Sequence, residues 1–255
     1  MKQKISILGC GWLGMPLALS LASKGFFVKG STTSMSKYEK LKSENISPYL
    51  IELSNLENNI SKFLASEILI ITVPPKNIDY IKKLIHQIKK SNTKKVLFVS
   101  STSVYKNLNR IVTEETSTKN CLLKSIEQLF TENKKTKSTI IRFGGLFGYN
   151  RKPENFIPLD KKIENPEGYV NLIHRDDCIR IIEQIVLKDI WGELFNACTD
   201  SHPKRREFYI KENLKSGRKT PKFNENSLNN YKIISSEKLK SILDFSFEYS
   251  DLMSY

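Results

Sequence analysis

Short apolar runs alternate with helical segments through the first half of the chain. Strands buried on both faces of a sheet are predicted by five continuous runs, at residues 5–8, 26–28, 49–53, 68–73 and 96–99. Between the last two runs, a 3.6-residue apolar period predicts an amphipathic helix whose buried face is formed by Ile78, Ile81, Leu84, Ile85 and Ile88. Residues 13–21 also have helical spacing. Repeated strand–helix units of this kind predict an α/β fold with a doubly wound parallel sheet.

The second half continues this alternation less regularly. It predicts helices at 122–130, 176–187 and 205–215, strands at 139–142, 194–197 and 232–234, and a last helix from Ser236. Residues 143–167 have no regular pattern. Because this stretch is longer than an ordinary connection, we expect it to carry function.

A glycine-rich loop follows the first predicted strand. Residues 9–14, GCGWLG, fit the G-x-G-x-x-G pattern of dinucleotide-binding loops and open a predicted helix. The first glycine allows a tight turn, the second lets the backbone approach a pyrophosphate, and the third allows close helix–strand packing. The helix N-terminus adds N–H donors and a positive dipole end. We expect Cys10 to fill space and the cofactor to contact Gly9, Gly11, Trp12, Leu13 and Gly14. The alternative is a glycine turn without a ligand.

The second predicted strand bears on the choice between NAD and NADP. An acidic residue about 20 positions after the glycines would bind the ribose 2′-hydroxyl of NAD. The segment from Ser31 through Thr32 and Thr33 to Ser34 has none, and its hydroxyls and Lys37 suit a 2′-phosphate. We therefore expect NADP, with NAD as the alternative. The same residues would also suit an N-cap cluster for the next helix.

Two more segments fall at the predicted carboxyl edge of the sheet, where ligands bind in open α/β folds. The Val73-Pro74-Pro75 segment ends the fourth strand because proline stops the hydrogen-bond ladder, and we expect it to wall the cofactor cleft. Four hydroxyl residues follow the fifth strand. Ser100 is expected at the cofactor, and Ser101, Thr102 and Ser103 at a carbonyl or sugar oxygen of the substrate. Alternatively, these hydroxyls satisfy loose backbone groups.

The chain has 255 residues, with 41 Lys and Arg against 27 Asp and Glu and a net charge of +14. This charge allows anionic partners. It is spread along the chain, so we expect a solvated basic surface, a small-molecule substrate and no nucleic-acid partner. The apolar runs are too short to span a membrane. None of the four cysteines is in a C-x-x-C pair, so no metal site is predicted. A reduced, cytoplasmic location is expected, without a signal peptide.

Five segments, in order, resemble the short-chain dehydrogenase/reductase superfamily. They are GCGWLG from residue 9, SSTSVY from 100, IRFGGLFG from 141, VNLIHRDD from 170 and FNACTDSHPKRREF from 195. Within the superfamily they are most similar to the extended or atypical, NAD-dependent epimerase/dehydratase-like branch. The resemblance implies a Rossmann fold in a single unit, 1–255. A dinucleotide-binding core over 1–143 would be followed by 144–255, which completes the core and adds a small C-terminal substrate lobe.

The resemblance also implies functional residues. A nicotinamide cofactor would be held for hydride chemistry, and the superfamily's catalytic Ser/Thr falls on Ser101. The substrate-side loop falls on residues 145–153, and the Asn-x-Ile-His-x-x-Asp segment on 171–177. Members commonly dimerise through the helix that corresponds to residues 119–130, which would make this chain a homodimer.

One departure from the superfamily concerns the catalytic acid/base. Redox-active members carry Tyr-x-x-x-Lys on the helix after the fifth strand, where lysine lowers the tyrosine pKa and holds the nicotinamide ribose. Here the two positions fall on Lys119 and Leu123, or on Asn120 and Lys124 if the register slides by one. Neither register supplies the tyrosine. The glycine that usually follows Val-Tyr is replaced by Lys106.

Other side chains are candidates for the missing acid/base. Lys119 is a candidate for catalysis, or for binding a ribose or phosphate, and the alternative is a solvated lysine near the helix start. His174 is a candidate base near neutral pH, although structural hydrogen bonds beside Asp176 and Asp177 are the more common role. Tyr105 is expected to be buried packing.

The start of the predicted substrate lobe holds candidate substrate contacts. Arginines there would clamp phosphate or carboxylate oxygens in bidentate pairs. The alternative is an ordinary surface role. The candidate residues are Arg142, Gly145, Asn150 and Arg151, with Lys152 beside them.

Two function classes follow from these features. The first is an NADP-preferring oxidoreductase or epimerase that acts on a small or sugar-like substrate by hydride transfer with a nonstandard acid/base. The second is a catalytically degenerate NAD(P)-binding sensor or partner-binding protein, which the missing tyrosine favours.

Overall fold

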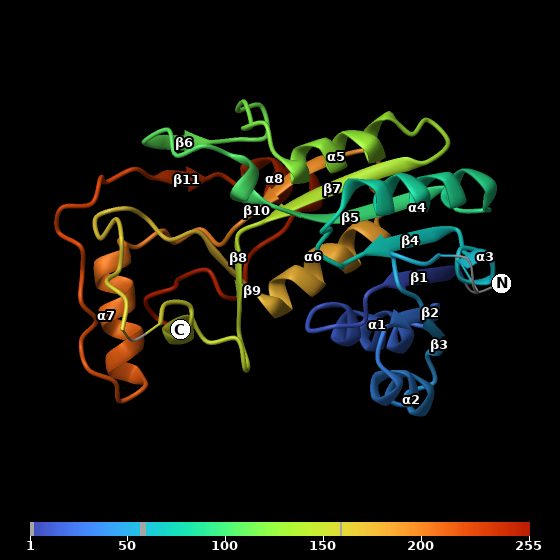
Figure 1. The fold of residues 1–255 in the computed structure, drawn as a ribbon, viewed down its shortest axis with the longest axis horizontal. Coiled ribbons are helices and arrows are strands. Elements are labelled where there is room, and N and C mark those ends of the chain that lie inside the picture. The colour runs from blue at the N-terminus through green and yellow to red at the C-terminus, as the bar shows by residue number, and fades with distance from the viewer. Residues whose placement is uncertain (1–2, 57–59, 159) are drawn as a thin grey trace. The chain divides into compact units, whose positions relative to one another are not determined.

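A seven-stranded parallel sheet forms the centre of the computed structural model, which describes residues 3–56, 60–158 and 160–255 (Figure 1). The strand order is β10-β7-β5-β4-β1-β2-β3. In register, Ile5 of β1 pairs with Val28 of β2 on one side and Ile68 of β4 on the other. The order reverses between β1 and β4, the position where Rossmann folds bind ligands. The strands are β1 (Lys4–Leu8), β2 (Phe27–Thr32), β3 (Ser47–Leu50), β4 (Ile68–Ile71), β5 (Lys95–Ser101), β7 (Lys137–Phe143) and β10 (Leu194–Ala197). The predicted fold class is confirmed.

The helices follow the predicted apolar periods. In α4, Ile81, Leu84, Ile85 and Ile88 are buried, and the Asn77 side chain caps the N-terminus by accepting the Asp79 N–H. The α-helices are α1 (Gly14–Ser23), α2 (Met35–Ser43), α3 (Ile60–Phe63), α4 (Ile78–Lys90), α5 (Leu122–Glu132), α6 (Arg175–Leu187), α7 (Arg205–Lys215) and α8 (Glu237–Leu243). Short 3₁₀ turns occur at η1 (Thr102–Val104) and η2 (Pro153–Asn155).

Two small parallel pairs accompany the main sheet. β6 (Arg110–Val112) pairs with β11 (Lys232–Ile234), and β8 (Gly145–Phe147) pairs with β9 (Leu172–His174). Sequence analysis predicts β11 but neither β6 nor the β8–β9 pair. The stretch expected to be irregular, 143–167, therefore contains β8 and η2, and its residue 159 lies outside the described residues.

The second strand is longer than its apolar run. β2 continues past Val28 through buried Lys29, whose ammonium donates to the carbonyls of Lys62 and Ala65 at 2.6 and 3.0 Å. These hydrogen bonds make burial of the charge tolerable. The run predicted at 49–53 forms β3 two residues earlier, since Ser47 pairs with Lys29.

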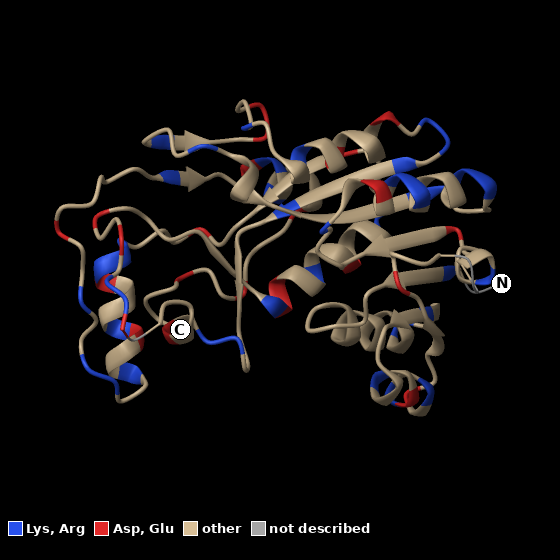
Figure 2. Cartoon of the chain, in the orientation of Figure 1, with Lys and Arg blue, Asp and Glu red and all other residues tan. Residues whose placement is uncertain are grey.

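The chain forms two compact units that interleave along the sequence. The first contains Met1–Ser100, Asn120–Ile141 and Ile182–Leu194, and the second contains Ser101–Lys119, Arg142–Ile181 and Phe195–Tyr255. Sequence analysis instead divides the chain once, after residue 143. Each unit has its own apolar cluster, one around Phe63, Phe98 and Phe130 and the other around Phe147 and Phe208. Lys and Arg occur on elements of both units, including α4 and α7 (Figure 2).

Candidate functional site

Two glycines of the loop between β1 and α1 are required by packing. Gly9 has φ +103°, and a Cβ there would lie 2.3 Å from Cγ1 of Val73. A Cβ on Gly14 would lie 2.2 Å from the Gly9 carbonyl oxygen. Both distances are far below van der Waals contact, so any larger residue would displace the loop or α1. The predicted roles of these glycines, a tight turn and close helix packing, match this geometry.

Gly11 differs from its neighbours. Among the described residues beyond its chain neighbours, no atom lies within 4 Å of a Cβ built at this position. Packing within the protein therefore does not require glycine here. The open space suits a pyrophosphate that approaches the backbone.

The helix that follows the loop presents free N–H groups. Leu13 is the N-cap of the ten-residue α1, and no side chain of the described chain caps it. An uncapped helix start suits a bound anion because its N–H groups need acceptors. Leu13 is buried and Trp12 is partly buried. The glycine loop and the start of α1 together fit a dinucleotide pyrophosphate.

The loop is held from two neighbouring strands. The Ser31 hydroxyl at the end of β2 accepts the Gly9 N–H at 2.9 Å. Thr72, directly after β4, donates its hydroxyl to the Gly9 carbonyl at 2.7 Å. Ser31 is 1% exposed, so its hydroxyl supports the loop and does not face a ligand directly. Cys10 fills space as expected, since its sulfur would lie 2.7 Å from a Cβ on Gly30.

Thr72 is a functional residue that sequence analysis missed. Its only indication in the sequence is a hydroxyl placed between a buried apolar run and the Val73-Pro74-Pro75 segment. Val73 packs against Gly9, while Pro74 is exposed and Pro75 is partly buried.

The residues after β2 divide between structural and open positions. Thr32 accepts the Ser34 N–H at 3.2 Å and is 8% exposed. Thr33 and Lys37 are exposed. Ser34 stands at the N-cap of α2 without a side-chain cap hydrogen bond.

Ser100 lies at the end of β5 beside a buried carboxylate. Its hydroxyl donates to Oε1 of Glu127 in α5 at 2.6 Å, and both residues are buried. The Lys124 ammonium lies 3.8 Å from Oε2 of the same glutamate. Sequence analysis does not predict Glu127, which stands within the apolar face of α5.

In the second unit, the hydroxyls after β5 cap a short turn. The Ser101 hydroxyl accepts the Ser103 N–H at 3.1 Å, which satisfies a backbone group as the alternative interpretation expects. Thr102 is buried and Ser103 is exposed. Within the described residues no acceptor is assigned to the Ser101 O–H, so this proton remains available to a ligand oxygen.

Lys119 lies before α5, not on it. Its N–H donates to the Val104 carbonyl at 2.9 Å, and Thr118 forms an antiparallel bridge with Tyr105. The helix begins only at Leu122. Lys119 is exposed, so the tyrosine position of the first register carries an exposed ammonium group.

Tyr105 and Arg142 are both 1% exposed. The Tyr105 hydroxyl donates to Oδ1 of Asn196 at 2.9 Å and accepts from Nη1 of Arg142 at 2.6 Å. Burial raises the pKa of Tyr105. The expected packing role of Tyr105 is confirmed. The proposed anion clamp at Arg142 needs correction, because its guanidinium lies in the interior with Tyr105 as a partner.

The remaining substrate candidates lie on and after β8. Gly145 pairs with Leu172 and is exposed. Asn150 and Arg151 are exposed in a turn closed by reciprocal backbone hydrogen bonds between Gly148 and Arg151. These three positions are accessible to a ligand of the second unit.

His174 is 3% exposed and packs among aromatic rings, with the Tyr249 ring centroid 3.6 Å away. Its Nδ1 accepts the Asp176 N–H at 3.3 Å, beside the start of α6. Burial lowers the pKa of His174. The structural alternative given for this histidine in the sequence analysis matches these contacts.

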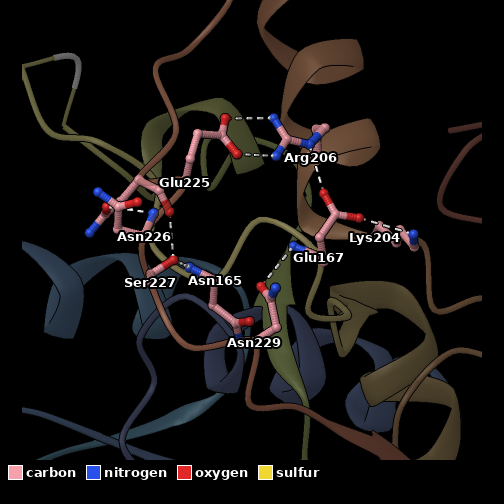
Figure 3. Close-up of polar contacts among 9 residues, drawn as sticks. Asn165, Glu167, Lys204, Arg206, Glu225, Asn226, Ser227 and Asn229 are labelled. Atoms are coloured by element: carbon pink, nitrogen blue, oxygen red, sulfur yellow. Dashed lines mark hydrogen bonds and ion pairs between the residues drawn. The ribbon is translucent and has the colours of Figure 1, made fainter.

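A polar network orders the end of the long stretch after β8 (Figure 3). Arg206 donates to Glu225 at 2.7 Å and to Glu167 at 2.8 Å, and Lys204 pairs with Glu167 at 3.0 Å. Ser227 accepts the Asn165 N–H at 2.8 Å. These contacts tie the segment after α7 to the residues before β9. The cations lower the pKa values of both glutamates.

Two searches of the described residues give negative results. None of the helices has both the length and the apolar character to cross a membrane. No group of three or more His, Cys, Asp and Glu side chains is arranged to hold a metal ion in the described ranges.

Comparison with known proteins relates both the loop and the whole fold to other chains. A family model described as the NAD binding domain of 6-phosphogluconate dehydrogenase matches residues 4–124. The chain is 30% identical to "Protein YeeZ" of Escherichia coli K12 over 268 positions, covering 98% of this chain and 97% of that protein.

Solved structures share the fold. UDP-glucuronic acid 4-epimerase from Bacillus cereus, in complex with UDP-glucuronic acid and NAD, has a TM-score of 0.81 at 18% identity, covering 99% of this chain and 96% of that chain. The dTDP-glucose 4,6-dehydratase from Bacillus anthracis, in complex with NAD, has a TM-score of 0.77 at 17% identity, covering 98% and 94%. At these identities the likeness concerns the fold alone.

Proposed function

This chain belongs to the family of Protein YeeZ and contains an NAD-binding Rossmann domain of the epimerase/dehydratase-type short-chain dehydrogenase/reductase fold, and from this we propose an NADP-preferring oxidoreductase or epimerase. Its substrate would be a small or sugar-like molecule. The Bacillus cereus epimerase supports a sugar-like substrate, since its complex contains UDP-glucuronic acid. We further propose that the protein acts in the cytoplasm as a homodimer, without a nucleic-acid partner.

The open position at Gly11 is the observation that carries the cofactor proposal. Gly9 and Gly14 are required by contacts inside the protein, whereas Gly11 has free space around its missing side chain. A bound pyrophosphate would account for a glycine at this position. The uncapped start of α1 would supply N–H donors to the same phosphates.

The preference for NADP rests on the residues after β2. Thr33 and Lys37 are exposed, and a hydroxyl with an ammonium suits a 2′-phosphate. Ser31 would act indirectly by holding Gly9. NAD remains the alternative cofactor.

A bound nicotinamide cofactor would supply or accept a hydride. The chain would contribute polar groups of the second unit. Ser101 would donate its O–H to the reacting oxygen of the substrate. Lys119 would hold or transfer the proton that tyrosine handles in other members. Gly145, Asn150 and Arg151 would contact the substrate.

A second candidate function is cofactor binding without catalysis. Two observations favour it: the tyrosine position is held by exposed Lys119 before α5, and the hydroxyl of buried Tyr105 is engaged by Arg142 and Asn196. Such a protein would act as a nucleotide sensor or would bind a partner.

Thermal-shift titrations with NADPH and NADH test the cofactor. A ligand that binds only the native state raises the melting temperature by mass action. We expect a larger shift with NADPH at equal concentration, and a smaller difference in Thr33→Ala and Lys37→Met. No shift with either nucleotide would refute both candidate functions. Turnover of a carbonyl and alcohol panel that is lost in Ser101→Ala would then exclude the non-catalytic candidate.

A further inference from the structure

The second unit contains a cavity of about 420 Å³ that is lined entirely by its own residues. Tyr149, Tyr249 and Tyr255 supply aromatic walls together with His174. A cavity of this size, with aromatic walls and few polar groups, is typical of small-molecule sites.

The aromatic walls are preformed. The Tyr149 hydroxyl donates to Asp176 at 2.8 Å, and the Tyr249 ring packs on His174 with centroids 3.6 Å apart. Tyr149 nevertheless remains 53% exposed. The cavity therefore offers fixed ring surfaces, and a ligand would not have to order them.

Glu212 of α7 lines the cavity, and its side chain is only 3% exposed. No hydrogen bond reaches its Oε1 from the described residues. The Lys211 ammonium lies 3.1 Å from this oxygen, but its hydrogen bonds go to the main-chain oxygens of Leu252 and Tyr255 at 3.0 and 2.8 Å. A buried carboxylate oxygen without a donor is uncommon. A ligand O–H or N–H would satisfy it.

The charges that line the cavity balance. Lys152 and Lys215 provide two cations, and Glu154 and Glu212 provide two carboxylates. Lys211 adds a partner for Glu212 behind the wall. A charged ligand would therefore meet opposing interactions, and a neutral ligand is favoured.

The polar groups also fix the kind of neutral ligand. Glu154 and Glu212 accept hydrogen bonds, whereas the lysines donate them. A hydroxyl is the neutral group that satisfies both, because it donates one bond and accepts others. Flat tyrosine walls suit the apolar C–H face of a ring that carries such hydroxyls.

We propose that this cavity binds a neutral polyhydroxylated ring, such as a saccharide or cyclitol unit, with a ligand hydroxyl donating to Oε1 of Glu212. The proposal concerns the second unit alone and does not depend on dinucleotide binding. Lys152 would donate to a second hydroxyl, and Tyr249 and Tyr255 would contact the ring.

Saturation-transfer NMR on the full chain, without added nucleotide, tests this site. The probes are methyl β-D-glucopyranoside and myo-inositol, with choline and inorganic phosphate as charged probes observed by their own resonances. We expect transfer to the ring protons of at least one neutral probe. Glu212→Gln should raise its Kd about tenfold, since a charged acceptor becomes neutral. Glu207→Gln is the matched control, because Glu207 is an exposed carboxylate on the same helix.

The outcomes distinguish the possibilities. Binding of choline or phosphate without either neutral probe would overturn the proposal, as would equal affinity of the two Gln variants or no binding by any probe. If Glu212→Gln does not fold, Lys152→Met replaces it, since Lys152 is exposed. It should weaken binding several-fold, and unchanged binding would again refute the site. A separate NADPH titration of the same sample reports on the dinucleotide site independently.

Discussion

Replacing Gly11 by alanine should weaken dinucleotide binding without destabilising the fold. A Cβ at this position meets no described atom within 4 Å, so the free energy of unfolding should change by no more than about 0.5 kcal/mol. The added methyl group would occupy the space expected for the pyrophosphate. We expect the Kd for NADPH to rise at least about tenfold, equivalent to about 1.4 kcal/mol.

Gly14→Ala is the matched comparison. Its Cβ would lie 2.2 Å from the Gly9 carbonyl, so the loop or α1 must move. Overpacking of this kind costs about 1–3 kcal/mol of stability. Urea unfolding measures the stability of both variants, and isothermal titration with NADPH measures binding. The reasoning is refuted if Gly11→Ala binds NADPH like the wild type, or if it loses as much stability as Gly14→Ala.

Three further predictions concern hydrogen bonds and protonation. Thr72→Val removes the donor to the Gly9 carbonyl and should cost about 1–2 kcal/mol in urea unfolding and weaken NADPH binding, whereas Thr72→Ser should retain both; equal behaviour of the two variants would contradict this. Ser100→Ala leaves an oxygen of buried Glu127 without its 2.6 Å donor, so unfolding should become easier by about 1–3 kcal/mol, and the double variant with Glu127→Leu should recover part of that loss; no recovery would argue against the pair. Burial lowers the pKa of His174 below 6.5, so the unfolded chain binds the proton more readily, and the stability from the neutral ring should be lost as pH falls below about 6.5. Chemical denaturation between pH 5 and 8 should show a weaker slope in His174→Gln, and an identical slope would exclude this contribution.

The sequence predicts the elements best where an apolar period is bounded on both sides. The helix at 205–215 and the strands at 194–197 and 232–234 have the predicted bounds. The second strand is predicted too short because Lys29 is polar yet buried. Its ammonium reaches carbonyls at Lys62 and Ala65, more than 30 positions along the chain. Periodicity reports which face is buried, and it carries no information about such distant partners.

The candidate site divides in the same way. The glycine loop is predictable because each glycine answers a local backbone requirement. Thr72 and Glu127 are not predictable because their contacts, to Gly9 and Ser100, depend on which strands and helices become neighbours. Arg142 is misjudged for a related reason. A charged residue at a strand end suggests a surface, but here Tyr105 provides an interior partner.

The two successive hydroxyls after β2 have a consequence for altering cofactor choice by design. Ser31 is committed to holding Gly9, so changing it would disturb the loop under either nucleotide. Thr33, two residues later, is exposed. Support and selectivity are thus separated along one short segment. A carboxylate introduced at position 33 would meet water instead of the loop, so exchanging one nucleotide for the other would not require the phosphate cradle to be rebuilt.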